Sequence, residues 1–283
     1  MRVLEKNSPL LSLNTASLGH RSPISEVIER AARHGFGSIV PWRRDLEGCE
    51  VHAVARQIKD AGLKVNGLCR STYFPQETEQ TRRAALEDNK RALETAALLG
   101  ADCYILVVGS LPAGSRDLAS ARRQVKDGVA ELMETARELR VPLALEPLHP
   151  MTAGDRSCLN TLGQALDWCE ALDPHNSGDL GVALDVYHLW WDEYLERDIA
   201  RAGKQNRILG FHVSDWLVPT TDLVQDRGMM GDGVVDLRQI RRWVEAAGYA
   251  GPVEVEIFSK NNWWLQNEDD VLSTCIDRMT TVC

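Results

Sequence analysis

The stretch LALEPLH, residues 143–149, joins a short apolar run to a carboxylate and a proline. An unbroken apolar run of this length indicates a strand that is buried on both faces, as the strands of a parallel sheet are. The run stops at Pro147, so the ionisable side chain of Glu146 stands where the strand ends. This pattern predicts an α/β fold with a polar site at the strand ends.

The same pattern recurs three times toward the C-terminus. The stretches are VALDVYH (182–188), ILGFHVSD (208–215) and VEVEIF (253–258). They place Asp185, His212 and Glu256 at strand ends. Parallel strands that are each followed by a helix leave their carboxyl ends on one face of a barrel, so these residues and Glu146 should meet there. Three carboxylates so close together repel one another unless a cation compensates them.

We therefore expect a metal site made of Glu146, Asp185, His212 and Glu256. Taken singly, each of these residues could equally be a polar strand end bonded to a helix N-terminus, but four in series argue against coincidence. Three carboxylates with one imidazole suit one divalent ion. Mn²⁺ is the first choice, Mg²⁺ and Co²⁺ are alternatives, and Zn²⁺ is less favoured.

The rest of the chain predicts a single (β/α)8 TIM barrel that spans residues 1–283 as one domain. We expect strands at residues 10–15, 37–41, 64–69, 103–108, 143–146, 182–185, 208–212 and 253–256. We expect helices near residues 24–34, 50–61, 78–99, 118–139, 162–172, 193–202, 237–247 and 269–279. Ser22 before Pro23 predicts the start of the first helix, and Asp236 should cap the seventh.

The composition of the chain limits the classes of molecule that it can bind. The formal net charge of −9 argues against nucleic acid, which requires a basic surface. No apolar run approaches the roughly 18 residues of a membrane span, and the N-terminus lacks the layout of a secretion signal, so we expect a cytoplasmic protein. The seven cysteines form no CxxC pair and predict reduced thiols. We expect a small carbohydrate substrate and a homo-oligomer, either a dimer or a tetramer.

Several motifs together resemble the xylose-isomerase-like TIM-barrel superfamily, which contains sugar phosphate isomerases and epimerases, including ketose 3-epimerases. The matching pieces are LEPL (145–148), LDVYH (184–188), HVSD (212–215), GDGVVD (231–236) and Glu256. The resemblance covers the whole chain, and its motifs lie mainly in the second half. It is specific for the superfamily and weak for the substrate.

This resemblance implies roles for individual residues. In the ketose epimerases the two glutamates that correspond to Glu146 and Glu256 serve as bases as well as metal ligands. Asp185 and His212 would be ligands only, and His188 matches a position that contacts a substrate oxygen. A divalent ion at this site would acidify the hydrogen beside a sugar carbonyl and stabilise an enediolate, and two bases on opposite faces would then invert the carbon.

One position departs from the ketose-epimerase pattern. Those enzymes carry a substrate-binding arginine six residues after the histidine ligand, where this chain has Val218. Arg227 could take that role from a longer loop. Arg70 and Trp216 are further candidates for substrate binding, since both follow predicted strands, although an arginine there is as often a surface ion pair and a tryptophan is more often core.

The departure at Val218 keeps a second chemistry open. An anion beside a carbonyl can also expel a leaving group, so a lyase or dehydratase acting by β-elimination on a 3-keto glycoside or keto-inositol is the alternative to an isomerase or epimerase. The apurinic endonuclease branch of the superfamily needs three zinc ions and histidines after strands two to four. The corresponding ends, PWR (41–43), CRS (69–71) and VGS (108–110), contain none.

Overall fold

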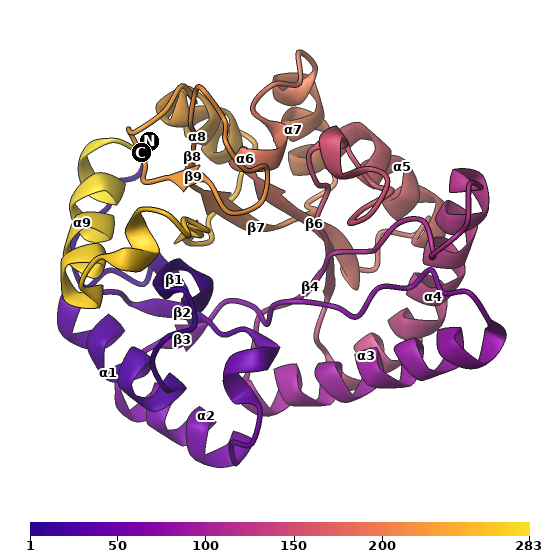
Figure 1. Cartoon of the computed structure of the whole chain (residues 1–283), viewed down its shortest axis with the longest axis horizontal. Helices are drawn as coiled ribbons and strands as arrows, with labels where there is room; N and C mark the ends of the chain where they lie inside the picture. The colour runs from indigo at the N-terminus through magenta and orange to yellow at the C-terminus, as the bar shows by residue number, and fades with distance from the viewer.

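The computed structural model describes residues 1–283 and contains one curled sheet of eight parallel strands surrounded by helices (Figure 1). The strand order is β3 (Lys64–Val65), β2 (Ser38–Val40), β1 (Leu11–Asn14), β10 (Val253–Val255), β7 (Ile208–Val213), β6 (Leu180–Asp185), β5 (Leu143–Leu145) and β4 (Tyr104–Leu106). A parallel bridge between Leu68, which follows β3, and Tyr104 of β4 closes the ring. The prediction of a single (β/α)8 barrel is therefore confirmed. No helix is long and apolar enough to span a membrane.

The barrel strands fall where the apolar runs predicted them, although most are shorter. They are β1 Leu11–Asn14, β2 Ser38–Val40, β3 Lys64–Val65, β4 Tyr104–Leu106, β5 Leu143–Leu145, β6 Leu180–Asp185, β7 Ile208–Val213 and β10 Val253–Val255. The helices are α1 Ile24–His34, α2 Val51–Asp60, α3 Glu79–Leu99, α4 Leu118–Leu139, α5 Leu162–Leu172, α6 Val186–Leu189, α7 Leu195–Lys204, α8 Leu237–Ala246 and α9 Glu268–Thr281. Four 3-10 turns are η1 Thr15–Leu18, η2 Arg43–Leu46, η3 Pro150–Thr152 and η4 Trp263–Leu265.

Of the two capping residues that the sequence predicted, the structure confirms Asp236 and contradicts Ser22. The Asp236 side chain accepts a hydrogen bond from the backbone N–H of Gln239, so it caps α8 as predicted. Ser22 does not cap α1, because its hydroxyl donates to Glu268 of α9 instead. That contact links the first and last helices, so a tertiary partner outcompeted the local cap.

Two groups of apolar residues fill the molecule. The larger group lies mainly between the outer faces of the strands and the helices, as expected for a barrel whose helices cover the sheet. The smaller group contains Val40, Cys69, Cys103, Ile105, Ala144 and Ala183, which belong to neighbouring strands and strand ends. Both cysteines are buried free thiols, consistent with packing rather than disulfide formation.

The long segment after β7 is an ordered hairpin. Strands β8 (Asp215–Trp216) and β9 (Arg227–Gly228) pair antiparallel, outside the barrel sheet. The buried carboxylate of Asp215 accepts hydrogen bonds from the backbone N–H groups of Trp216, Gly231 and Val235. At Gly233, an added Cβ would lie 2.1 Å from the Trp216 carbonyl oxygen, so only glycine fits. These contacts fix where Arg227 enters the barrel.

Candidate metal centre and active site

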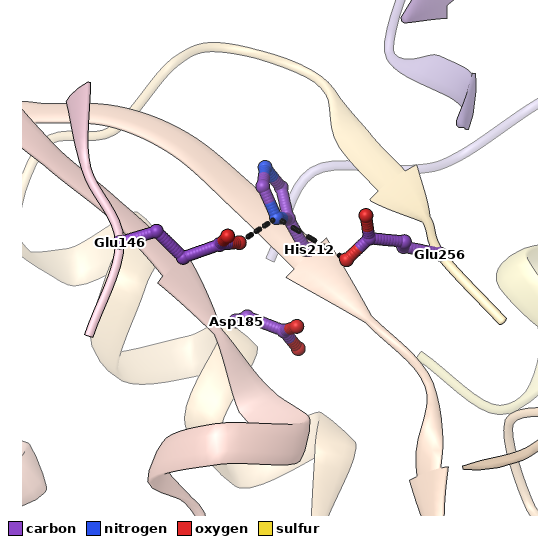
Figure 2. Close-up of side chains that lie close together, drawn as sticks. All are labelled: Glu146, Asp185, His212 and Glu256. Atoms are coloured by element: carbon purple, nitrogen blue, oxygen red, sulfur yellow. Dashed lines mark hydrogen bonds and ion pairs between the residues drawn. The ribbon is translucent and has the colours of Figure 1, made fainter. Parts of the chain in front are cut away.

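Glu146, Asp185, His212 and Glu256 converge at the carboxyl ends of the strands (Figure 2). One ligand atom from each lies within 4.8 Å of the others, and all four residues are buried. Sheet register explains the meeting, since Asp185 of β6 pairs with His212 of β7. Glu146 and Glu256 each follow the last residue of a strand, on either side of that pair.

The imidazole of His212 is oriented with Nδ1 toward the cluster. This nitrogen lies 3.0 Å from Oε1 of Glu146 and 3.9 Å from Oε2 of Glu256 (Figure 2). Its Nε2 faces the other way, 3.6 Å from Oε2 of Glu254. Nδ1 is therefore the nitrogen that could ligate a cation, while Nε2–H would point at a carboxylate.

Glu254 lies in β10, two residues before Glu256, and is buried. Its partner is Asn14, whose Nδ2 donates to Oε1 of Glu254 at 2.8 Å and to Oε1 of Glu256 at 3.0 Å. The indole N–H of Trp42 donates in turn to the amide oxygen of Asn14 at 2.7 Å. Asn14 and Glu254 are 240 positions apart in the chain, so only the fold brings them together.

Arg227 reaches into the cluster from β9. Its Nη1 donates to Oδ2 of Asp185 at 2.8 Å and to Oε2 of Glu256 at 3.2 Å. Its Nη2 donates to Nε2 of His188 at 3.2 Å; since a guanidinium cannot accept, this nitrogen is the acceptor. The guanidinium also packs over the ring of Tyr187 at 4.4 Å.

The protein charges alone leave the site with an excess of negative charge. Burial and the neighbouring carboxylates raise the pKa of Glu256 to about 8, although Arg227 opposes the shift. Burial would also raise the pKa of Asp185, but Arg227 and the nearby histidines outweigh it and hold that pKa below its usual value. Burial lowers the pKa of His188 to about 3 and keeps it neutral. Near neutral pH, Glu256 would thus hold a proton unless a cation were bound.

The donor set fits a divalent cation. Three carboxylates and one imidazole nitrogen, all buried and within reach of one point, are ligands that a divalent metal accepts. Glu146, Asp185, His212 and Glu256 would hold it, and its charge would allow Glu256 to ionise.

A pocket opens onto this cluster. Its walls include the predicted residues Arg70, His188, Arg227, Glu146 and Glu256. The sequence did not single out the other lining residues as site residues; they are Trp42, Cys69, Val107, Leu148, Thr152, Arg156, Leu223, Val224 and Phe258. Most of these lie in loops whose side chains show no periodic pattern, so only the fold could bring them together.

Trp216 does not line this pocket. It is buried, with its ring 4.8 Å from the rings of both His149 and Tyr187. The ring of Tyr187 lies between Trp216 and the guanidinium of Arg227 that it packs against. Trp216 therefore contacts the pocket wall from its outer side. This geometry favours a packing role for Trp216 over direct contact with a substrate.

Residues 28–277 match the family model described as xylose isomerase-like TIM barrel, and the chain belongs to this family. Among curated proteins it is similar to L-ribulose-5-phosphate 3-epimerase UlaE of Escherichia coli, with 26% identity over 250 residues, 84% of this chain and 76% of that protein. Among solved structures, protein SMc04130 from Sinorhizobium meliloti 1021 is 50% identical, with a TM-score of 0.93 over 97% of this chain and 98% of that one. The IolI protein with a bound zinc atom is 20% identical and has a TM-score of 0.82 over 96% and 97% of the two chains, which shows a shared fold.

The position of Glu254 behind His212 yields a prediction about metal affinity. Glu254→Gln removes the negative charge opposite Nε2 but keeps an oxygen for Asn14, so we expect metal affinity to fall about 10- to 100-fold. Metal titration of the purified variant by calorimetry measures this. Glu268→Gln is the matched control, because Glu268 is a buried glutamate of α9 that pairs with Arg30. Equal affinity in both variants would mean that His212 needs no support from Glu254.

Proposed function

We propose that this protein is a divalent-metal-dependent epimerase or isomerase that acts on a keto sugar by proton abstraction through an enediolate. The observation that carries the proposal is the placement of two buried glutamates, Glu146 and Glu256, on the two sides of one candidate metal site. The similarity to a sugar 3-epimerase supports the same reaction class.

Mn²⁺ is the ion we propose, because three carboxylates and one imidazole form an oxygen-rich set. Zn²⁺ belongs among the ions to be tested, since the similar IolI structure contains it. When bound, the ion would polarise the carbonyl of the sugar and acidify the neighbouring C–H bond.

The protein side chains supply the proton transfers and the binding. Glu146 would act on one face of the reacting carbon and Glu256 on the other, so one removes the proton and the other returns it with inverted geometry. Arg227 and His188 would hold a substrate oxygen beside this carbon. The apolar side chains of Leu223 and Val224 line the same pocket and would limit the entry of water.

Arg227 also bears on the choice between epimerisation and elimination. The elimination alternative rested on Val218, which replaces the arginine of the ketose epimerases. Val218 is 68% exposed and does not line the pocket, whereas Arg227 donates to Asp185 and Glu256. A guanidinium in the pocket supports epimerisation, because the function of the missing arginine has a candidate replacement.

The proposal is tested by isotope exchange after metal depletion. We expect chelator to abolish activity and added Mn²⁺ or Co²⁺ to restore it, with about one ion per chain, because four ligands complete one site. Incubation of ketoses, ketose phosphates and a 3-keto glycoside in ²H₂O should give epimerised, deuterated sugar without loss of a group. Loss of a leaving group would identify a lyase instead, and two or three tightly held ions per chain would contradict a single site.

A further inference from the structure

Two arginines in the pocket have no hydrogen-bond or ion-pair partner for their guanidinium groups within the protein. Arg70 and Arg156 both line the pocket that opens onto the metal cluster, and both are half-buried. Neither guanidinium takes part in a hydrogen bond or an ion pair. Every other buried or half-buried arginine has such a partner, as Arg43 has in Asp88 and Arg207 in Asp173. Partly burying a guanidinium without an acceptor is unfavourable. Two such groups in one pocket therefore indicate that a ligand supplies the acceptors.

Arg70 is held in place without a carboxylate. Its guanidinium carbon lies 4.9 Å from the ring centroid of Tyr73 and 5.9 Å from that of Trp42. Contacts with aromatic faces position a guanidinium while leaving its N–H donors free. The pocket also continues past Trp42 and Arg70 into a wider groove that Arg43 and Arg44 line. Glu47 is the carboxylate in that groove, and it makes no ion pair with Arg70.

Arg156 comes from a different part of the chain, the loop between η3 and α5. It lines the same pocket as His188 and Glu256, so this guanidinium faces the site. Hydrogen bonds from the backbone N–H groups of Val224 and Gln225 are the main cause of the lowered pKa of Asp222. Arg156 adds to that shift, but the two side chains form no ion pair. Two cationic side chains from separate loops therefore face one pocket.

The charges at the metal cluster leave these arginines uncompensated. A divalent ion, when bound, and Arg227 would together balance the three carboxylates Glu146, Asp185 and Glu256. Glu254 lies beneath the cluster, bound to Asn14, and does not line the pocket. A neutral sugar would supply no countercharge to Arg70 and Arg156, whereas an anionic substituent would accept charge-assisted hydrogen bonds from both.

We propose that the substrate carries an anionic group, a phosphate or a carboxylate, that Arg70 and Arg156 bind at the mouth of the pocket. This inference rests on the proposed function for the reacting end of the sugar and adds the chemical class of its other end. It accounts for basic side chains in the pocket of a chain whose net charge is −9.

The test measures binding separately from turnover, with three compounds that have no ketone or aldehyde group and so cannot form an enediolate. Ribitol, ribonate and ribitol 5-phosphate are titrated calorimetrically into the metal-loaded protein. We expect ribonate or ribitol 5-phosphate to bind about tenfold or more tightly than ribitol, and the preference to weaken as salt is added. The anion that gains more identifies the substituent as carboxylate or phosphate.

Variants assign that preference to the two arginines. Arg70→Met and Arg156→Met keep an apolar stem but remove the charge, so each should reduce the preference for the anion about tenfold and leave ribitol affinity unchanged. Arg116→Met is the control, since Arg116 is exposed in the loop after β4 and lines neither pocket. Circular dichroism checks that each variant is folded.

The outcomes separate this inference from the proposed function. Equal affinity for ribitol and both anions, or a preference that survives both substitutions, would overturn the anion site while leaving epimerisation intact. Tighter anion binding without ²H exchange into any keto sugar would support the anion site and contradict the proposed function instead.

Discussion

Glu146→Gln and Glu256→Gln are each expected to lower turnover about 10²- to 10⁴-fold, because glutamine keeps the size and an oxygen donor but cannot take up a proton. Metal would stay bound at lower affinity, since a carbonyl oxygen is a weaker ligand than a carboxylate. Steady-state kinetics with parallel metal analysis measures both effects. Glu268→Gln, which removes a buried carboxylate outside the pocket, should leave turnover near normal.

Isotope exchange gives each glutamate variant a distinct signature. Each single variant should lose epimerisation, because inversion needs a base on both faces of the enediolate. One variant should still exchange the substrate hydrogen with ²H₂O from one epimer, since the remaining base removes and returns a proton on its own side. Near-normal rates in both variants with full metal occupancy would show that neither carboxylate is the base.

Arg227→Met is expected to destabilise the metal-free protein by about 3–5 kcal/mol, the cost of leaving buried carboxylates without their cationic partner. The guanidinium donates to Asp185 and Glu256, and both are buried. A bound divalent ion supplies replacement charge, so the loss should be much smaller in the metal-loaded protein. Urea denaturation with Mn²⁺ and with chelator gives the two free energies of unfolding.

Arg207→Met is the matched control for this experiment. Arg207 is also buried and pairs with Asp173, outside the metal cluster. Its loss should destabilise the protein equally with and without metal. If Arg227→Met behaved in the same way, Arg227 would not share the carboxylates with the metal.

In the metal-loaded form Arg227→Met should also lower kcat/KM with metal content unchanged, as a substrate-binding role requires.

The sequence by itself was sufficient to predict the barrel fold and to predict that four residues meet at one face of it. Helices α4 and α5 have the bounds that the sequence predicted, 118–139 and 162–172, because helix signals such as their N-caps Asp117 and Thr161 are local. Glu146, Asp185, His212 and Glu256 could be grouped without coordinates, since parallel strands bring their carboxyl ends to one face whatever the loops do. That these four bind a metal stays a prediction, and the structure supplies the distances on which it rests.

Only the tertiary structure decided which side chains surround that cluster. Asn14 of β1 reaches Glu254 of the neighbouring strand β10, Ser22 bonds α9 instead of capping its own helix, and Trp216 packs behind Tyr187 rather than in the pocket. Arg156 joins Arg70 from a loop with no periodic pattern. The periodicity of a strand or helix fixes which way a side chain faces, whereas a loop side chain is placed by contacts with residues distant in the chain, and these exist only once the barrel has closed.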